Sequence, residues 1–292
     1  MLSPVLIWPH FDPTSVAGER AVRRRLARAR HTVIEARSTL ALAALALGIE
    51  APPAAALARL AEGCSTDSRW FLAEPVMLIP DRDRLLLRRL GGDGLSAAEA
   101  QALIGAAHKH FPASELRLER AAPGHWYARF GSAEARPGMA IEALGDAPID
   151  VTPEAFGLSM DGVRRLNELQ MLWYEHPVNR ARKTAGRLQA NALWVWGGGA
   201  LPPVAPSVNA RVLAAQAPEL RGLAQWLHLE HRTPEAALAE GIAPGLLGAV
   251  GAGEEALGRR WMTALAGQRG LFRLFGSGRM WEVPGRVFWR HW

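Results

Sequence analysis

Cysteine and lysine are scarce in this sequence. Cys64 is the only cysteine, so the chain cannot form an internal disulfide, which favours a reducing compartment such as the cytoplasm. We expect Cys64 to be a small buried hydrophobic residue rather than a reactive thiol. Two of the 34 basic residues, Lys109 and Lys183, are lysines, which leaves 32 arginines. With so much Ala, Gly and Leu, this bias is typical of a GC-rich genome rather than of a nucleic-acid-binding surface.

Long hydrophobic runs are also missing. The longest apolar run, residues 39–48, has about half the length of a membrane span, so it predicts a core helix and no membrane segment. Residues 1–13 have no basic region, and Pro9, His10 and Asp12 interrupt their apolar stretch. We therefore expect no signal peptide and a soluble, cytoplasmic protein.

The densest basic run is residues 23–30, with sequence RRRLARAR. Its arginines alternate with apolar positions as in an amphipathic helix, so a solvated helix face is the preferred interpretation. A patch for nucleic acid or anionic lipid is the alternative. Motifs of the RNP, zinc-finger and helix-turn-helix types are absent, so the sequence does not favour a nucleic-acid partner.

The pattern of helices and strands predicts an α/β (α+β) fold in three segments. Residues 1–70 contain a buried strand at 4–9 and two or three helices interrupted at 50–53. Residues 71–202 form the mixed α/β region, and residues 203–292 form a helical region with terminal strands. Since no low-complexity linker separates these segments, we expect one compact globular unit.

The middle segment predicts a hairpin, a helix and a second hairpin. Strands at 75–80 and 84–88 flank a turn, and Ser96 with Glu99 forms a capping-box pattern at the start of a helix that ends near residue 110. Two further strands follow. Their predicted ranges are 115–120 and 125–130.

The remaining elements are predicted from periodicity and helix-end signals. A helix capped by Asp161 ends near residue 175, and a buried strand at 192–196 leads into three glycines. Helical stretches are expected at 208–228 and 254–268, and strands at 271–275 and 286–292.

Residues 167–199 carry the candidate ligand site. Their polar side chains surround a buried strand whose terminal glycines could present backbone N–H groups to an anion. His176, Arg180, Arg182 and Arg187 could add charged contacts to a phosphate or carboxylate. Alternatively, His176 and Pro177 cap and turn a helix, Asn191 bonds local backbone, and the glycines only permit a tight turn. The candidate ligand-binding residues are His176, Asn179, Arg180, Asn191, Gly197, Gly198 and Gly199, and the supporting residues are Asn167, Glu168, Gln170 and Trp194.

Other catalytic patterns are weak. His228 and His231 have a spacing that could share a metal, but no further ligand is evident, and an ordinary His pair is the better interpretation. Ser159, Ser207 and Ser277 lie outside any nucleophile-elbow context. We predict no metal site and no cofactor.

The segment from Asn167 onward resembles the bacterial family of RpfE-type regulatory proteins, whose members often carry the name phosphoglycerate mutase. The likeness covers about residues 70–202 and includes the early Pro75-Val76-x-Leu78 pattern and Trp126-Tyr127. Its main motifs are Asn-Glu-x-Gln-Met-Leu, His-Pro-Val-Asn and Asn-x-x-Trp-x-x-Gly-x-Gly. The matching positions are Asn167, Glu168, Gln170, Met171, Leu172, His176, Pro177, Asn179, Asn191, Trp194, Gly197 and Gly199.

The same stretch is similar, more distantly, to archaeal-type cofactor-independent phosphoglycerate mutases. That likeness implies a phosphoglycerate-mutase-like unit and chemistry that needs two metals, several Asp and His ligands and a Ser or Thr nucleophile. This chain has Trp196 where the mutases have an arginine, and Trp8-Pro9-His10 where an Asp-Gly would end the first strand.

Four hypotheses for the function are considered, and one of them, regulation of expression by direct DNA contact, rests only on the family's label and the net charge. The leading hypothesis is a non-catalytic or degenerate mutase-like regulatory protein that binds a small phosphorylated or carboxylated ligand. The second is an active phosphoryl-transfer enzyme with a rebuilt site. The third is a protein-interaction module, in which residues 23–30 or the Trp-rich end (Trp281, Trp289 and Trp292) bind a protein partner.

Overall fold

The chain folds as two units in the computed structural model. The first unit consists of Met1–Pro52, Leu57–Cys64 and Pro202–Trp292, and the second of Pro53–Ala56 and Ser65–Leu201. The second unit nearly spans the segment 71–202, while the three-segment division itself stays a prediction. The structure describes residues 3–16, 18–66, 69–81, 84–90, 94–121, 126–131, 136–144, 153–251 and 254–285.

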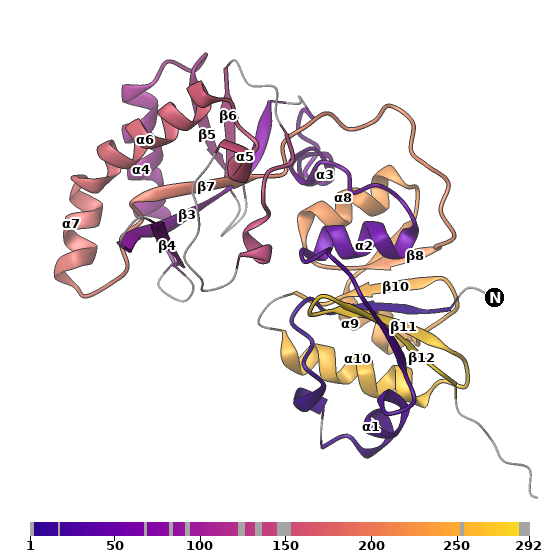
Figure 1. The fold of residues 1–292 in the computed structure, drawn as a ribbon. Coiled ribbons are helices and arrows are strands. Elements are labelled where there is room, and N and C mark those ends of the chain that lie inside the picture. Colours follow the sequence, from indigo (N-terminus) through magenta and orange to yellow (C-terminus); the bar gives the residue numbers. More distant parts are fainter. Residues whose placement is uncertain are drawn as a thin grey trace, which may run out of the picture. The chain divides into compact units, whose positions relative to one another are not determined.

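The first unit contains a seven-stranded sheet in the order β2-β12-β11-β1-β10-β8-β9 (Figure 1). The run from β11 to β9 is parallel, and β12 and β2 extend it by antiparallel pairing. The strands are β1 (Val5–Ile7), β2 (Arg30–Val33), β8 (Val212–Ala214), β9 (Glu230–Arg232), β10 (Leu246–Ala249), β11 (Phe272–Gly276) and β12 (Arg279–Val283).

Helices cover both faces of this sheet. α2 packs on β1, β10 and β11, and in Figure 1 it lies on the face opposite to α9 and α10. α8, α9 and α10 connect successive parallel strands, as in doubly wound α/β folds. Since both faces are covered, all three residues of β1 are buried. The helices are α1 (Arg20–Leu26), α2 (Thr39–Leu47), α8 (Pro218–Trp226), α9 (Pro234–Glu240) and α10 (Glu255–Gly267), with a 3-10 turn at Pro13–Val16.

The second unit is built on the long strand β3, which pairs antiparallel with β4, β6 and β7, while β5 pairs with β6. α4 packs on β5, and α6 packs on β7 and α4. The strands are β3 (Trp70–Asp81), β4 (Arg84–Arg89), β5 (Leu116–Arg120), β6 (Trp126–Phe130) and β7 (Ala192–Trp196). The helices are α3 (Ala54–Ala61), which spans the boundary between the units, α4 (Ala97–His110), α5 (Pro153–Phe156), α6 (Met160–Tyr174) and α7 (Pro177–Thr184), with a 3-10 turn at Ile141–Ala143.

The α/β class and the hairpin–helix–hairpin order are confirmed. The Ser96 hydroxyl accepts from the Glu99 N–H at 3.2 Å, and the Glu99 carboxylate accepts from the Ser96 N–H at 2.7 Å. This capping box starts α4 at the residue after Ser96, where the sequence predicts it. Among the described residues, none of the helices is long and apolar enough to cross a membrane.

Several predictions are wrong, most of them for the two ends of the chain. The stretch predicted as helix at 208–228 begins with β8, and β2 interrupts the predicted N-terminal helices. β12 is missed, although Ser277 (φ 47°) and Gly278 (φ 70°) form the two-residue turn of a β-hairpin. α6 is capped by Ser159 rather than Asp161. The predicted strand at 286–292, with Trp289 and Trp292, lies outside the described residues.

Arg25 of α1 is buried in the first unit. The sequence instead predicts that the whole basic run 23–30 is a solvated helix face. The Arg25 side chain is 7% exposed. The guanidinium donates to the carbonyl oxygens of Leu265, Gly270 and Pro284 at 2.8 Å and of Gln268 at 3.0 Å. Because Leu265 lies in the last turn of α10, the cation also meets the negative end of that helix dipole. Arg25 therefore joins α1 to the connection between α10 and β11.

Replacing Arg25 with methionine is expected to lower the free energy of unfolding by about 3 kcal/mol, because one buried and three partly buried carbonyl groups lose a charged donor. Urea denaturation followed by tryptophan fluorescence measures the change. The control is Arg24→Met, which alters an exposed residue of the same helix and should change stability by less than about 0.5 kcal/mol. Equal effects of the two substitutions would show that the carbonyl contacts of Arg25 are dispensable.

Candidate functional site

The predicted site segment folds as helix α6, a sharp turn, helix α7 and strand β7. His176 is the N-cap residue of α7, and its Nδ1 accepts a hydrogen bond from the Val178 N–H at 3.2 Å. Pro177 occupies the first helical position, where a backbone N–H has no partner within the helix. The capping role of His176 is therefore confirmed.

The surroundings of His176 favour its neutral form. Partial burial lowers the pKa of His176, and the positive charge of Arg180 lowers it further. A neutral ring with its proton on Nε2 leaves Nδ1 free to accept from Val178, whereas a protonated ring has no acceptor. The cap and the protonation state of His176 are thus coupled.

Asn179 is fully buried, and its side-chain amide bonds to main-chain groups. Its Nδ2 donates to the carbonyl oxygens of Trp173 at 2.8 Å and Ala190 at 2.9 Å. Its Oδ1 accepts from the Ala190 N–H at 2.9 Å. The Asn179 amide therefore fastens the end of α6 to the chain that enters β7.

Asn191, the residue before β7, also bonds to main-chain groups, and its partner lies on β3. Its Oδ1 accepts from the Leu78 N–H at 2.8 Å, and its Nδ2 donates to the Leu78 carbonyl at 2.9 Å. The regular ladder between β7 and β3 ends where Ala192 lies opposite Val76. The side chain of Asn191 thus extends the ladder to the next buried residue of β3.

The three glycines that follow β7 begin with Gly197, whose backbone bonds to two other segments of the second unit. Gly197 has φ 69°, a conformation that favours glycine, and its N–H donates to the Pro137 carbonyl. Its own carbonyl accepts from the Ala55 N–H at 2.9 Å, at the start of α3. Gly198 is buried and Gly199 is partly buried. Since an anion nest needs N–H groups directed at the ligand, the bond to Pro137 removes Gly197 from such a role.

The arginines of this segment do not converge on an open site. Arg180 is exposed, whereas Arg182 and Arg187 both donate to the Glu99 carboxylate, at 3.1 and 3.2 Å. Burial raises the pKa of Glu99, but hydrogen bonds from Ser96 and Arg182 outweigh it, so the pKa lies below its usual value. Glu99 is therefore ionised and pairs with Arg182 and Arg187, two of the arginines that the sequence suggests as contacts for a phosphate.

The supporting residues are spread over two elements. Asn167 is exposed on α6, and Glu168 pairs with the arginine three residues before it at 3.2 Å. Gln170 is partly buried on the same helix. Trp194 on β7 is buried, and its indole N–H donates to the Met139 carbonyl at 2.9 Å.

The structure therefore brings His176, Asn179 and Asn191 together as a turn that attaches two helices to β7. The hydrogen bonds found for their side chains all go to main-chain groups. Arg180 and Asn167 instead face solvent. A ligand-binding role for this group stays a prediction, while the contacts present are those that hold the second unit together.

A doubly wound sheet binds its ligands at the carboxyl ends of the strands, and here aromatic side chains fill the end of β1. Trp8 and Phe11 are 2% and 0% exposed, with ring centroids 5.3 Å apart. Phe11 meets Trp281 edge-on at 5.2 Å. A Cβ at Gly258 would lie 2.6 Å from the Trp8 ring, so α10 packs directly on it. Trp8, Phe11 and Trp281 are called the aromatic cluster below.

Of the polar residues after β1, Asp12 forms hydrogen bonds within the local turn and His10 is exposed. The Asp12 carboxylate accepts hydrogen bonds from the Thr14 N–H at 2.8 Å and the Thr14 hydroxyl at 2.5 Å. These bonds lower the pKa of Asp12, which stays ionised. His10 is exposed. The sequence shows Trp8, Pro9 and His10 at this position, whereas the burial of Trp8 against Phe11 is visible only in the structure.

Two further expectations can be compared with the structure. Cys64 is exposed, so the expectation of a buried residue is wrong. His228 is exposed with φ 54°, and His231 Nε2 lies 2.8 Å from the Ala215 carbonyl. Within the described ranges, no group of three His, Cys, Asp or Glu side chains is placed to hold a metal ion. A cavity of about 330 Å³ opens at the amino ends of the parallel strands.

Replacing Asn191 with alanine is expected to lower the free energy of unfolding by about 2 kcal/mol, because it leaves the buried N–H and C=O of Leu78 without their partner. Asn167→Ala, on the exposed face of α6, is the matched control and should change stability by less than about 0.5 kcal/mol. Thermal unfolding compares the two variants. An unchanged melting temperature for Asn191→Ala would contradict the proposed structural role.

The His176 cap is expected to make stability depend on pH. The folded-state pKa lies below the unfolded value, so the unfolded chain binds the proton more readily. The contribution is complete above the unfolded pKa and is lost as the pH falls through the folded one. His176→Asn keeps an N-cap acceptor without a titrating ring, so the stability difference between the two proteins should shift in favour of the variant as the pH falls from about 7 to about 5. A pH-independent difference would exclude this coupling.

No protein-family model matches the chain, and no curated protein matches it. Two solved structures are similar in fold. The cofactor-independent phosphoglycerate mutase from Thermoplasma acidophilum shares 17% identity over 97% of this chain and 89% of that chain, with a TM-score of 0.41. The PH0037 protein from Pyrococcus horikoshii shares 13% identity over 98% of this chain and 88% of that chain, with a TM-score of 0.49.

Proposed function

We propose that the protein is a non-catalytic, phosphoglycerate-mutase-like regulatory protein of the cytoplasm that acts by binding a small anionic ligand. The sequence motifs between residues 70 and 202 support the mutase-like part of this proposal. The observation that carries the loss of catalysis is the aromatic cluster at the carboxyl end of β1. It fills the place where a fold of this class positions the groups that act on a substrate.

The packing of the aromatic cluster explains why this edge would not admit a phosphorylated substrate. Phosphoryl transfer needs charged groups that stabilise the charge on the transferred phosphate. Trp8 and Phe11 instead offer apolar surface, and the nearby Asp12 is held in a turn by Thr14. Opening this edge would expose two large buried side chains to water, which is costly because each buries a large apolar area.

The assay is the interconversion of 2- and 3-phosphoglycerate by the purified chain, with Mg²⁺, Mn²⁺ or Zn²⁺ added in turn. We expect no turnover above the rate without protein, while an active phosphoglycerate mutase serves as the positive control. Turnover at the rate of an ordinary enzyme, about 10 s⁻¹, would contradict the proposal. Loss of that turnover in His228→Ala would then favour the alternative of an active enzyme with a rebuilt site.

A further inference from the structure

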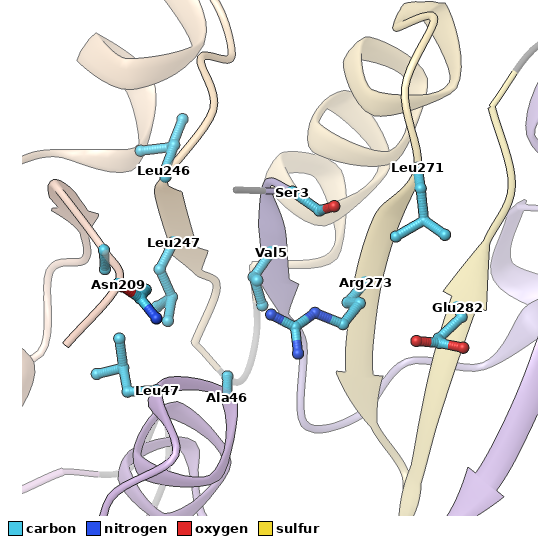
Figure 2. A pocket seen from close by; sticks show the side chains of 12 residues that line it. Ser3, Val5, Ala46, Leu47, Asn209, Leu246, Leu247, Leu271, Arg273 and Glu282 are labelled. Atoms are coloured by element: carbon cyan, nitrogen blue, oxygen red, sulfur yellow. The ribbon is translucent and has the colours of Figure 1, made fainter. Parts of the chain in front are cut away.

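The cavity of about 330 Å³ in the first unit lies at the edge of the sheet opposite to the aromatic cluster. It is formed by the amino ends of β1, β10 and β11, the chain before β8 and the last turn of α2 (Figure 2). Its volume lies in the range of small-molecule pockets. The lining residues that matter here are Val5, Ala46, Leu246, Leu247, Arg273 and Glu282.

Strand register places one cation in this cavity. Leu247, Val5 and Arg273 lie side by side on β10, β1 and β11, and Glu282 of β12 lies opposite Arg273. Strands covered on both faces normally carry apolar residues throughout, and the neighbours Phe272 and Leu274 do so. Arg273 is therefore an exception that core packing does not explain.

The guanidinium of Arg273 is available to a ligand. In Figure 2 it extends between Val5 and the end of α2 at Ala46, into the space that the cavity occupies. The Arg273 backbone N–H is bonded to the Pro4 carbonyl at 3.1 Å, but no hydrogen bond or ion pair of its side chain occurs within the described part of the chain. Arg25, on another element, shows what a structural arginine of this unit looks like, with its donors bonded to carbonyls.

The walls around Arg273 define the rest of the ligand. Val5, Leu246 and Leu247 are buried and form an apolar surface, and Leu271 stands at the rim. This combination suits a molecule with one charged end and a short hydrocarbon body. A planar guanidinium matches a carboxylate by two parallel hydrogen bonds.

Glu282 limits the charge of the ligand. Its carboxylate lines the same cavity on the strand next to Arg273, so it repels anions. A doubly charged phosphate ester experiences this repulsion more strongly than a singly charged carboxylate does. The site therefore discriminates against phosphate.

We propose that this cavity binds a small aliphatic monocarboxylate, with the carboxylate on Arg273 and the hydrocarbon chain against Val5 and Leu247. The inference rests on the proposed function and names the class of ligand for it. It also moves the ligand site from residues 176–199 of the second unit to the sheet of the first unit.

The experiment is a ligand-observed NMR titration of the full chain with isovalerate and, separately, with inorganic phosphate. We expect isovalerate to bind and phosphate to bind more weakly. Arg273→Gln should weaken isovalerate binding at least about tenfold, because the charged partner of the carboxylate is lost. Glu282→Gln should strengthen it, because a repulsive charge is removed. These opposite signs separate a ligand contact from a general loss of structure.

Two further variants act as controls. Arg279→Gln removes an exposed arginine of β12 that does not line the cavity, and it should leave isovalerate binding unchanged. Ala46→Leu adds volume from the last turn of α2 and should abolish binding while keeping helix propensity. Circular dichroism confirms that each variant is folded.

The proposal is overturned if isovalerate does not bind, if phosphate binds more tightly, or if Arg273→Gln and Arg279→Gln behave alike. Failure here is distinct from failure of the proposed function. Mutase turnover with intact isovalerate binding would remove only the non-catalytic assignment. Absence of both turnover and isovalerate binding would remove only this site.

Discussion

The first unit depends on the pairing of a three-residue strand with partners from the other end of the chain. β1 lies between β10 and β11, so Val5, Leu6 and Ile7 are matched with residues more than two hundred positions away. Short strands at the centre of a sheet hold only when both faces and both edges are covered. The aromatic cluster supplies this cover at one end of β1, and Arg25 secures the loop that leads into β11. The packing that stabilises β1 therefore limits which side chains can lie at the carboxyl edge of the sheet.

Local signals explain how much of the fold could be predicted. The Ser96 capping box and the apolar run of β7 act within a few residues, so the start of α4 and the bounds of β7 are predicted correctly. The strand predicted at 75–80 covers only the second half of β3. β2 was missed because all four of its residues are exposed, which leaves no apolar alternation to read. β8 has three residues, which are too few to show an alternation, so its range falls inside a predicted helix. The turn at Ser277 and Gly278 was the one available signal for β12.

The candidate site was harder to predict, because residue type does not say which partner a side chain meets. Asn179 and Asn191 are the residues that a ligand site would use, yet in the fold their amides replace missing strand partners. Arg182 and Arg187 lie eighty or more positions from Glu99, so their neutralisation becomes visible only in three dimensions. Arg273 cannot be singled out from the sequence, because an arginine between Phe272 and Leu274 resembles an ordinary half-exposed strand residue until the neighbouring strands are known.

The division of the chain also sets an order for synthesis. Most of the second unit comes from one continuous stretch, Ser65–Leu201, whereas the first unit needs both Met1–Pro52 and Pro202–Trp292. Translation at the usual rate of roughly 5–20 residues per second brings the second unit out of the ribosome whole, seconds before β11 emerges. Through that interval α2 and β1, which are among the most apolar segments of the chain, have no sheet to pack against. Met1–Pro52 therefore waits longest for the partners that bury its apolar residues.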